Sequence, residues 1–435
     1  MARVFKNDRC AVIMEKKIKV VWICHFSNPE VRSKLRYGFY PLDVLRKIMG
    51  KSSTANLDFA QWNTNGVKEF EKFDDVDLSI IMPIPGIKGR LQNFDMNGIH
   101  YYCFRSEDDN IRSIIFQRRK QTKYTRNRTL IKNIIEKVSP DIIHVIGAEN
   151  PYYSLATLDV PDNIPVLVYL QTLMSTPGFY ENYTINLNSY NYRSRIEQDV
   201  IRRADYVCTG VKEFQNTILQ SIKPDCRFLE ISIAVGQPVD LSEKKKEYDF
   251  VYFASNVQKA ADYAIEAFAI VCTKYPNLKL NIVGGFDNNY KSQLDNRLAE
   301  LGISDNVFFS GKLPTHGDVM IQIKKSRFAL LPMKVDIVAS TIRESMASGL
   351  PIVTTITPGT PLLNKDRECL LLSEIGDFES MANNMERLLS SEKLCEDLKK
   401  NAALTFQEMY SNEKSMKEWR DAYKEIVANW PKRGM

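Results

Sequence analysis

Short apolar runs alternate with longer amphipathic stretches along the whole chain. The runs are rich in Val and Ile and lack a strict apolar and polar alternation, which is typical of strands covered by helices on both faces. A first series of predicted strands lies at 19–26, 78–85, 99–104, 141–147, 166–171 and 206–211. A second series lies at 250–255, 279–285, 306–311, 328–333, 351–356 and 369–373. Strands that alternate with helices predict an α/β protein with two doubly wound parallel sheets.

A polar stretch at 235–249 separates the two series of strands. It contains Pro238 and a run of charged residues, as an interdomain linker does. A chain of 435 residues is too long for one ordinary core and suits two domains. Parallel sheets bind ligands at the carboxyl ends of their strands, so we expect one shared cleft. The predicted parts are an extension at 1–16, an N-terminal domain at 17–238, a linker at 239–248, a C-terminal domain at 247–410 and a final segment at 411–435.

The composition excludes several classes of protein. Hydrophobic residues make up 44% and charged residues 26% of the chain, which indicates a globular protein without long disordered tracts. The eight cysteines form no C-x-x-C pair, so we expect reduced thiols in the cytoplasm, without disulfides or zinc. No run approaches about 18 uninterrupted apolar residues, so no membrane-spanning helix is predicted. The D-x-D spacing of Asp75 and Asp77 precedes a strand and is interpreted as chance, so we expect no metal and no cofactor.

The strongest functional signal is the segment DIVASTIRESMASGLPIVTT at 336–355, between two predicted strands. Ser340 is a favourable N-cap and Gly349 a favourable stop for a helix of about two turns. Backbone amides around Ser340 and Thr341 would suit the phosphates of a nucleotide. Glu344 lies one turn further and could accept hydrogen bonds from both ribose hydroxyls. A solvated helix residue is the alternative interpretation of Glu344.

The spacing of Asp336 and Glu344, followed by MASGLPIVTT, resembles the E-x7-E signature of retaining glycosyltransferases of family four, the group 1 transferases with the GT-B fold. This resemblance implies two Rossmann-like doubly wound domains that face a central cleft. It assigns Glu344 to the nucleotide ribose and Asp336 to the donor sugar. Lys259 falls where the family carries a lysine against the donor diphosphate, and Gly359 is assigned to the same donor side. The chain departs from the family pattern because Asp336 replaces a glutamate and the arginine that accompanies the lysine is missing.

Candidates for the acceptor side lie in the first half of the chain. The stretch DIIHVIGAENPYYSLA resembles the His-rich strand end of the family and keeps one histidine, His144. A buried core histidine is the alternative interpretation of His144. The glycine turn of this stretch would bring Glu149 to the cleft, and His25 follows the first predicted strand as a weaker candidate. Glu149 is the stronger of these candidates and is counted with Asp336 and Lys259 among the catalytic candidates. A purely structural role is the alternative interpretation of Glu149, and an ordinary exposed lysine is that of Lys259.

The segment at 111–138 is more positively charged than the rest of the chain. It holds nine basic residues against Glu136 alone. The segment could lie on anionic lipid beside a lipid-linked acceptor, and a solvated helix face is the alternative. No aromatic and basic module accompanies it, so nucleic acid is not an expected partner. The residues assigned to a membrane surface are Arg118, Arg119, Lys120 and Lys123.

Together these features predict a retaining, metal-independent glycosyltransferase that uses a nucleoside diphosphate sugar. The expected acceptor is a saccharide or a lipid-linked saccharide, in the assembly of a cell-surface polysaccharide such as a capsule. The family also implies that the final helix, at about 413–429, packs back on the first domain. Two alternatives stay open. One is a nucleotide-sugar epimerase of the same fold, which the E-x7-E-like spacing disfavours, and the other is an inactive nucleotide-sugar-binding relative.

Overall fold

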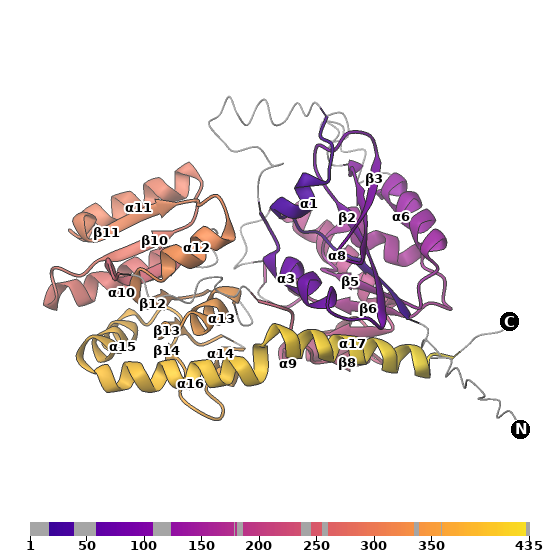
Figure 1. Cartoon of the computed structure of the whole chain (residues 1–435). Coiled ribbons are helices and arrows are strands. Elements are labelled where there is room, and N and C mark those ends of the chain that lie inside the picture. The colour runs from indigo at the N-terminus through magenta and orange to yellow at the C-terminus, as the bar shows by residue number, and fades with distance from the viewer. Residues whose placement is uncertain are drawn as a thin grey trace, which may run out of the picture.

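The computed structural model describes residues 17–38, 58–107, 123–177, 179–180, 186–235, 245–254, 260–334, 339–357 and 359–431. These residues form two α/β domains that lie side by side, each built around one sheet (Figure 1). The first sheet has eight strands and the second has six. The predicted architecture of two parallel-sheet domains is confirmed.

The first sheet is parallel except at one edge. In spatial order its strands are β3 (Leu91–Met96), β4 (Ile99–Phe104), β2 (Val76–Pro83), β1 (Ile18–Ile23), β5 (Ile142–Ile146), β6 (Val166–Tyr169), β7 (Tyr206–Cys208) and β8 (Phe228–Leu229). Only β3, paired with β4, runs antiparallel among the described pairs. The order of the strands changes direction between β1 and β5. In a doubly wound sheet, ligands are expected to bind at this switch point, at the carboxyl ends of the strands.

Both faces of the first sheet are covered, because successive side chains of its strands point to opposite sides. In β1, Val20 and Trp22 belong to one core cluster, while Val21 and Ile23 belong to the other. The first cluster includes helices α1 (Pro29–Ser33), α3 (Gln61–Phe70) and α17 (Asn412–Asn429). The second includes α6 (Thr125–Val138), α7 (Pro151–Ser154), α8 (Leu187–Arg203) and α9 (Lys212–Ser221).

The second sheet is parallel throughout its described strands. Their order is β11 (Val307–Gly311), β10 (Leu280–Val283), β9 (Tyr248–Phe253), β12 (Ser326–Leu331), β13 (Ile352–Thr355) and β14 (Leu371–Ser373). Helices α10 (Ala261–Lys274), α11 (Asn288–Glu300) and α15 (Phe378–Ser390) pack in one core cluster. Helices α12 (His316–Ile323) and α13 (Ser340–Ala347) pack in the other, and α16 (Glu392–Tyr410) contributes to both. The order of these strands changes direction between β9 and β12.

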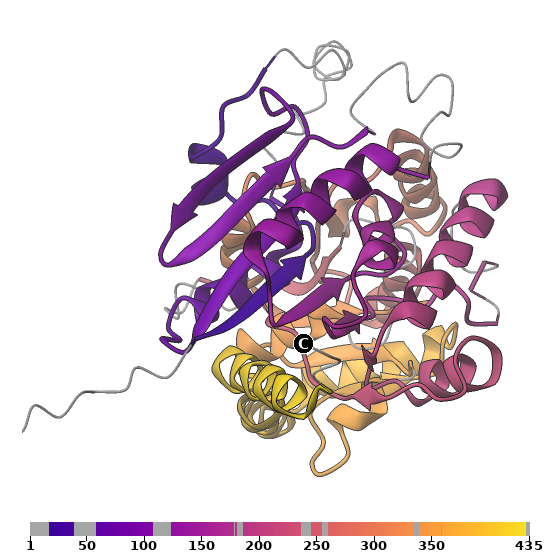
Figure 2. The same cartoon turned by 90° about the vertical axis from the view of Figure 1, so that its right-hand side faces the viewer.

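The last helix, α17, leaves the second domain and packs against the first. It directly follows α16 and runs along the lower edge of the molecule in Figure 1, and Figure 2 views it from its C-terminal end. The Trp419 indole donates a hydrogen bond to the Ser232 carbonyl at 2.9 Å, and the Trp22 indole donates one to the Tyr423 hydroxyl at 3.0 Å. None of the described helices combines the length and apolar character that a membrane crossing requires.

Asp75 anchors α17 to the first domain through ion pairs with Lys424 and Arg420. Partial burial would raise the pKa of Asp75, but these two cations outweigh it and lower that pKa. Asp77 lies 3.2 Å from the His100 ring. Each aspartate of the D-x-D spacing therefore has a different partner within the first domain and its docked helix.

Candidate functional site

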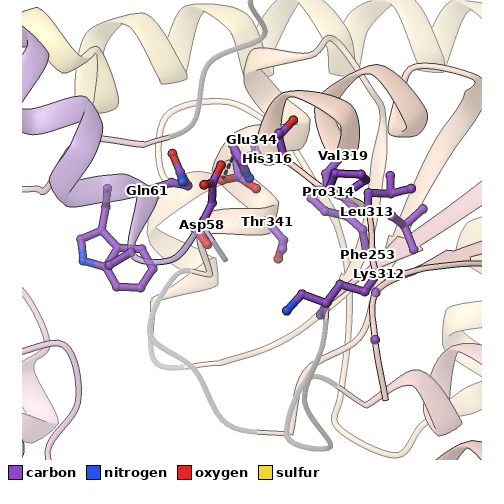
Figure 3. Close-up of a pocket in the computed structure, with 18 residues that line it drawn as sticks. Asp58, Gln61, Phe253, Lys312, Leu313, Pro314, His316, Val319, Thr341 and Glu344 are labelled. Carbon is purple, nitrogen blue, oxygen red and sulfur yellow. Dashed lines mark ion pairs between the residues drawn. The ribbon is translucent and has the colours of Figure 1, made fainter. Parts of the chain in front are cut away.

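A cavity of about 280 Å³ lies beside the switch point of the second sheet and faces the first domain. Residues that follow β9, β10 and β11 and the first residues of α12 and α13 line it. Asp58, Gln61 and Trp62 line it from the first domain. Figure 3 shows Asp58 and Gln61 entering from one side, opposite Lys312 and Leu313. The cavity therefore lies between the two domains, where the sequence predicted a shared cleft.

Helix α13 turns its first residues toward this cavity. The chain is extended at Ala339, with φ −57° and ψ 142°, and becomes helical at Ser340. The N-cap position therefore belongs to Ala339 and not to Ser340, which corrects the predicted cap. Ala339 has no polar side chain, so it cannot occupy the amides of the first turn. Ser340 and Thr341 both line the cavity, so a ligand anion could reach these amides.

Glu344 is the buried acid of the cavity, with 5% of its surface exposed. Its Oε1 atom lies 3.3 Å from Nε2 of His316, an ion pair that Figure 3 marks with a dashed line. The capping box of Thr315 and Asp318 fixes the start of α12 and thereby the place of His316. Burial alone would lower the pKa of His316, but Glu344 outweighs it and raises that pKa. When His316 is protonated, the wall of the cavity therefore carries a pair of opposite charges.

The sequence reasoning missed His316 and Lys312, although both follow the recognised strand at 306–311. Lys312 lines the cavity, and Figure 3 shows its amino group directed into the open space. Gly285 allows this approach, because a Cβ atom there would lie only 3.0 Å from Cβ of Lys312. The available signal was the pair Gly284–Gly285 at the end of a predicted strand, a pattern that often marks close approach of the backbone to a ligand.

The remaining donor-side predictions have different outcomes. The structure brings Ser340, Thr341 and Glu344 together in the cavity. Gly359 is buried at the start of α14 (Thr360–Leu363) and is not among the residues that line the cavity. Asp336 and Lys259 lie outside the described residues.

Glu149 follows β5 at the switch point of the first sheet and is 5% exposed. The Asn150 amide donates a hydrogen bond to Oε1 of Glu149 at 2.7 Å, and Arg193 of α8 lies 3.9 Å from the same oxygen. The second oxygen, Oε2, has no hydrogen-bond partner among the described residues. Burial raises the pKa of Glu149, and Arg193 and Asn150 oppose this rise only in part. A buried carboxyl group with one unused oxygen is suited to accept a hydrogen bond from a ligand hydroxyl.

His25 follows β1 and shares a hydrogen-bonded cluster with Glu149. Its Nδ1 atom lies 3.3 Å from the hydroxyl of Tyr153, which also accepts a hydrogen bond from Asn150 at 3.0 Å. Burial, with a smaller contribution from Arg193, lowers the pKa of His25 to about 4. The imidazole is therefore neutral near pH 7. The structure thus brings these two acceptor-side candidates together.

His144 lies within β5 and is 1% exposed. Its ring is 4.5 Å from that of Trp419, and its Nδ1 atom is 2.6 Å from the Tyr423 hydroxyl. The tautomer of His144 decides which of these two groups donates, and the Tyr423 hydroxyl also accepts a hydrogen bond from the Trp22 indole. Burial lowers the pKa of His144 to about 3. His144 is therefore a neutral core histidine beneath α17, which corrects its assignment to the acceptor side.

Only part of the basic stretch at 111–138 lies within the described residues. Arg118, Arg119 and Lys120 lie outside the described residues, and Lys123 is exposed just before α6. Within α6, Arg128 forms a two-pronged pair with Asp159, at 2.6 and 2.5 Å. Part of the positive charge is therefore matched within the domain, and the membrane role of the other residues stays a prediction.

The second half of the chain matches a known family. Residues 237–405 match the family model described as "Glycosyl transferases group 1". A Haemophilus influenzae protein described as "Uncharacterized glycosyltransferase" is 29% identical over 163 residues, which is 37% of this chain. The aligned region spans 44% of that relative's length. The predicted resemblance to the group 1 family is confirmed.

Solved structures resemble the chain over nearly its whole length. Sucrose-phosphate synthase from Thermosynechococcus elongatus superposes with a TM-score of 0.67 and 14% identity, covering 95% of this chain and 100% of that one. Anabaena Alr3699/HepE, solved in complex with UDP and glucose, gives a TM-score of 0.64 and 13% identity, covering 94% and 99%. These likenesses show the GT-B fold of two facing Rossmann-like domains.

Proposed function

Because residues 237–405 carry the group 1 glycosyl transferase match, we propose that the chain transfers a sugar from a nucleoside diphosphate sugar to a saccharide acceptor, with retention at the anomeric carbon. The proposed acceptor is a carbohydrate or a lipid-linked saccharide in cell-surface polysaccharide assembly. The proposed place of action is the cytoplasm, at the inner face of the membrane if the basic stretch binds lipid.

The position of Glu344 is the observation that supports this proposal most strongly. Glu344 is a buried carboxylate one turn into α13, in a cavity between two Rossmann-like domains. A nucleotide that places its diphosphate at the first turn of α13 would bring its ribose hydroxyls within reach of Glu344. The HepE structure, solved with UDP and glucose, supports a nucleotide sugar as the ligand of this fold.

The proposed reaction needs positive charge beside the leaving diphosphate. Negative charge grows on this group as the sugar departs, and fixed cations and amides stabilise it. The amides of α13 and the Lys312 amine line the cavity, and Lys259 is the further cation that the resemblance implies. The leaving phosphate then accepts the proton of the incoming hydroxyl, so the scheme requires neither a protein nucleophile nor a metal. On the acceptor side, Glu149 and His25 would hold that hydroxyl.

The direct test is the substitution Glu344→Ala with calorimetric titration of the nucleotide sugar. Loss of the charged hydrogen bonding to the ribose should weaken binding by about 1.5–3 kcal/mol. Glu379→Ala, at an exposed position of α15, is the matched control and should bind as the wild type does. Unchanged donor affinity in a folded Glu344→Ala protein would remove the ribose assignment.

Product analysis separates the proposed transferase from the two alternatives. A thermal-shift screen with UDP, GDP, ADP and CMP sugars first identifies the donor. Incubation with that donor and a saccharide then yields a glycosylated acceptor for a transferase, an epimer for an epimerase and no product for an inactive relative. Activity should persist in EDTA, and strict dependence on a divalent metal would contradict the metal-free scheme.

A further inference from the structure

A second pocket, of about 380 Å³, lies at the edge of the first sheet. It is separate from the interdomain cavity that contains Glu344, which is called the donor cavity below. Its basic side chains are Lys34 and Arg36, which follow α1, and Lys88, which precedes β3. Gln92 and Asn93 of β3 complete its polar lining. The described residues around this pocket include no carboxylate.

The walls of this pocket are joined by short hydrogen bonds. The Gln92 side chain accepts from the Arg36 amide at 2.9 Å and donates to the carbonyl groups of Arg36 and Lys88 at 2.7 and 2.8 Å. The Lys88 amide donates to the Arg36 carbonyl at 2.7 Å, and Tyr37 pairs with Ile87 in a bridge. The three cations therefore extend from a fixed backbone frame.

The three positive charges have no internal counter-charge in the described part of the chain. Lys34, Arg36 and Lys88 are exposed, and none forms an ion pair with another described residue. Nearby Arg32 differs, because it lies 2.7 Å from Asp58. Three like charges around one concavity create a positive potential that an anion would relieve. An arginine fork beside lysine amines is suited to the oxygens of a phosphate group.

The pocket is close to the proposed reaction site along the chain. Arg32 contacts Asp58, which lines the donor cavity, and Arg36 follows only four residues later. Four residues span at most about 14 Å. A ligand with a phosphate in this pocket could therefore extend a hydroxyl toward the cleft.

We propose that Lys34, Arg36 and Lys88 bind a phosphate group, and that this group belongs to the acceptor. The second half of this statement rests on the proposed glycosyl transfer, and the first half does not. Two kinds of ligand could supply this phosphate group, a phosphorylated saccharide and a phospholipid with its headgroup.

The test uses the full-length protein with Lys34→Gln, Arg36→Gln and Lys88→Gln combined. Saturation-transfer NMR compares glucose 6-phosphate with glucose, and flotation measures binding to vesicles of phosphatidylcholine with phosphatidylglycerol. The control combines Lys393→Gln, Lys399→Gln and Lys400→Gln, three exposed lysines of α16 in the other domain. We expect the pocket variant to weaken phosphate binding by at least about tenfold, since several charged hydrogen bonds are lost. The control should bind as the wild type does, and salt should weaken binding.

Each outcome has a defined meaning. Loss of glucose 6-phosphate binding in the pocket variant, without an effect on glucose, supports a phosphorylated saccharide. Loss of vesicle binding alone supports the pocket but assigns it to a lipid headgroup, which overturns the saccharide source. Equal behaviour of variant and wild type with both probes overturns the pocket. Nucleotide-sugar affinity, measured on the same variant, should be unchanged, so failure here is distinguishable from failure of the Glu344 experiment.

Discussion

At the scale of single residues, the pairing of Glu344 with His316 would link the proposed binding of a nucleotide sugar to pH. Glu344 raises the pKa of His316 above its ordinary value, so the charged imidazole persists to a higher pH than usual. While charged, it competes with the ribose hydroxyls for the carboxylate. Nucleotide-sugar affinity should therefore rise severalfold as pH increases from about 6.5 through the pKa of His316.

His316→Gln provides the check on this pH dependence. A neutral amide does not titrate, so its affinity should change less between pH 6 and 8 in calorimetric titrations. Thr315 and Asp318 still begin α12 in this variant, so the helix should persist. An identical pH profile in wild type and variant would rule out His316 as the titrating group.

His144 predicts a pH dependence of folding. Its folded pKa of about 3 lies below its unfolded value of about 6.5, so its contribution is complete above pH 6.5 and falls as the unfolded state takes up a proton. At pH 5 the loss is about 2 kcal/mol relative to pH 7. His144→Gln should remove this part of the difference between the free energies of unfolding in urea at the two pH values. The lowered pKa of His25 acts equally in both proteins, so the comparison isolates His144.

Some site residues could be predicted from the sequence and others could not. Glu344 belongs to a short motif whose helix start places it in the cavity. His316 is 28 positions away, and only the packing of α12 beside α13 brings it to Glu344. His144 carried two interpretations because a strand's sequence does not say which helix will cover it. The structure decides for the core interpretation through Trp419 and Tyr423.

At the scale of elements, most strands could be predicted because both of their faces are buried, which leaves continuous apolar runs. β3 was missed because its residues alternate between exposed and half-buried and include three polar residues. It is an antiparallel edge strand joined to β4 through Asn97–Gly98, a dipeptide that signals a hairpin. The start of α13 was misplaced by one residue because backbone conformation, and not side-chain preference, decides the cap there.

The loop after β5 predicts the effect of a single added methyl group. Gly147 has φ +95°, and a Cβ atom there would lie 2.6 Å from the Tyr153 hydroxyl. Gly147→Ala should destabilise the fold by about 1–3 kcal/mol in urea unfolding, because the residue is both strained and crowded. Gly210→Ala is the control, since a Cβ atom there meets nothing within 4 Å. Equal stability of the two variants would contradict the structure of this loop, which positions Glu149.

At the scale of the whole molecule, α17 is the element that joins the domains. Its position was implied only by family resemblance, because an amphipathic helix at the end of a chain could cover either sheet. Specific contacts decide the matter: Trp419 lies against His144, and Lys424 pairs with Asp75. The helix completes the core of the first domain while its chain continues directly from α16 of the second.

This connection predicts an uneven response to Trp419→Ala. Trp419 is 1% exposed, and deletion of a large buried aromatic side chain costs about 3–5 kcal/mol. The loss falls on the first domain, because the side chain packs in that domain's core. In scanning calorimetry the first domain should therefore unfold at a lower temperature, as a transition separate from that of the second.

The nucleotide sugar should still raise the melting temperature of the second transition, since Glu344, Lys312 and Thr341 lie in the second domain. Lys417→Ala, on the exposed side of α17, is the control and should leave the wild-type trace unchanged. If Trp419→Ala instead abolished the ligand-induced shift, the donor cavity would depend on the docked helix, and the two domains would have to be treated as one cooperative unit.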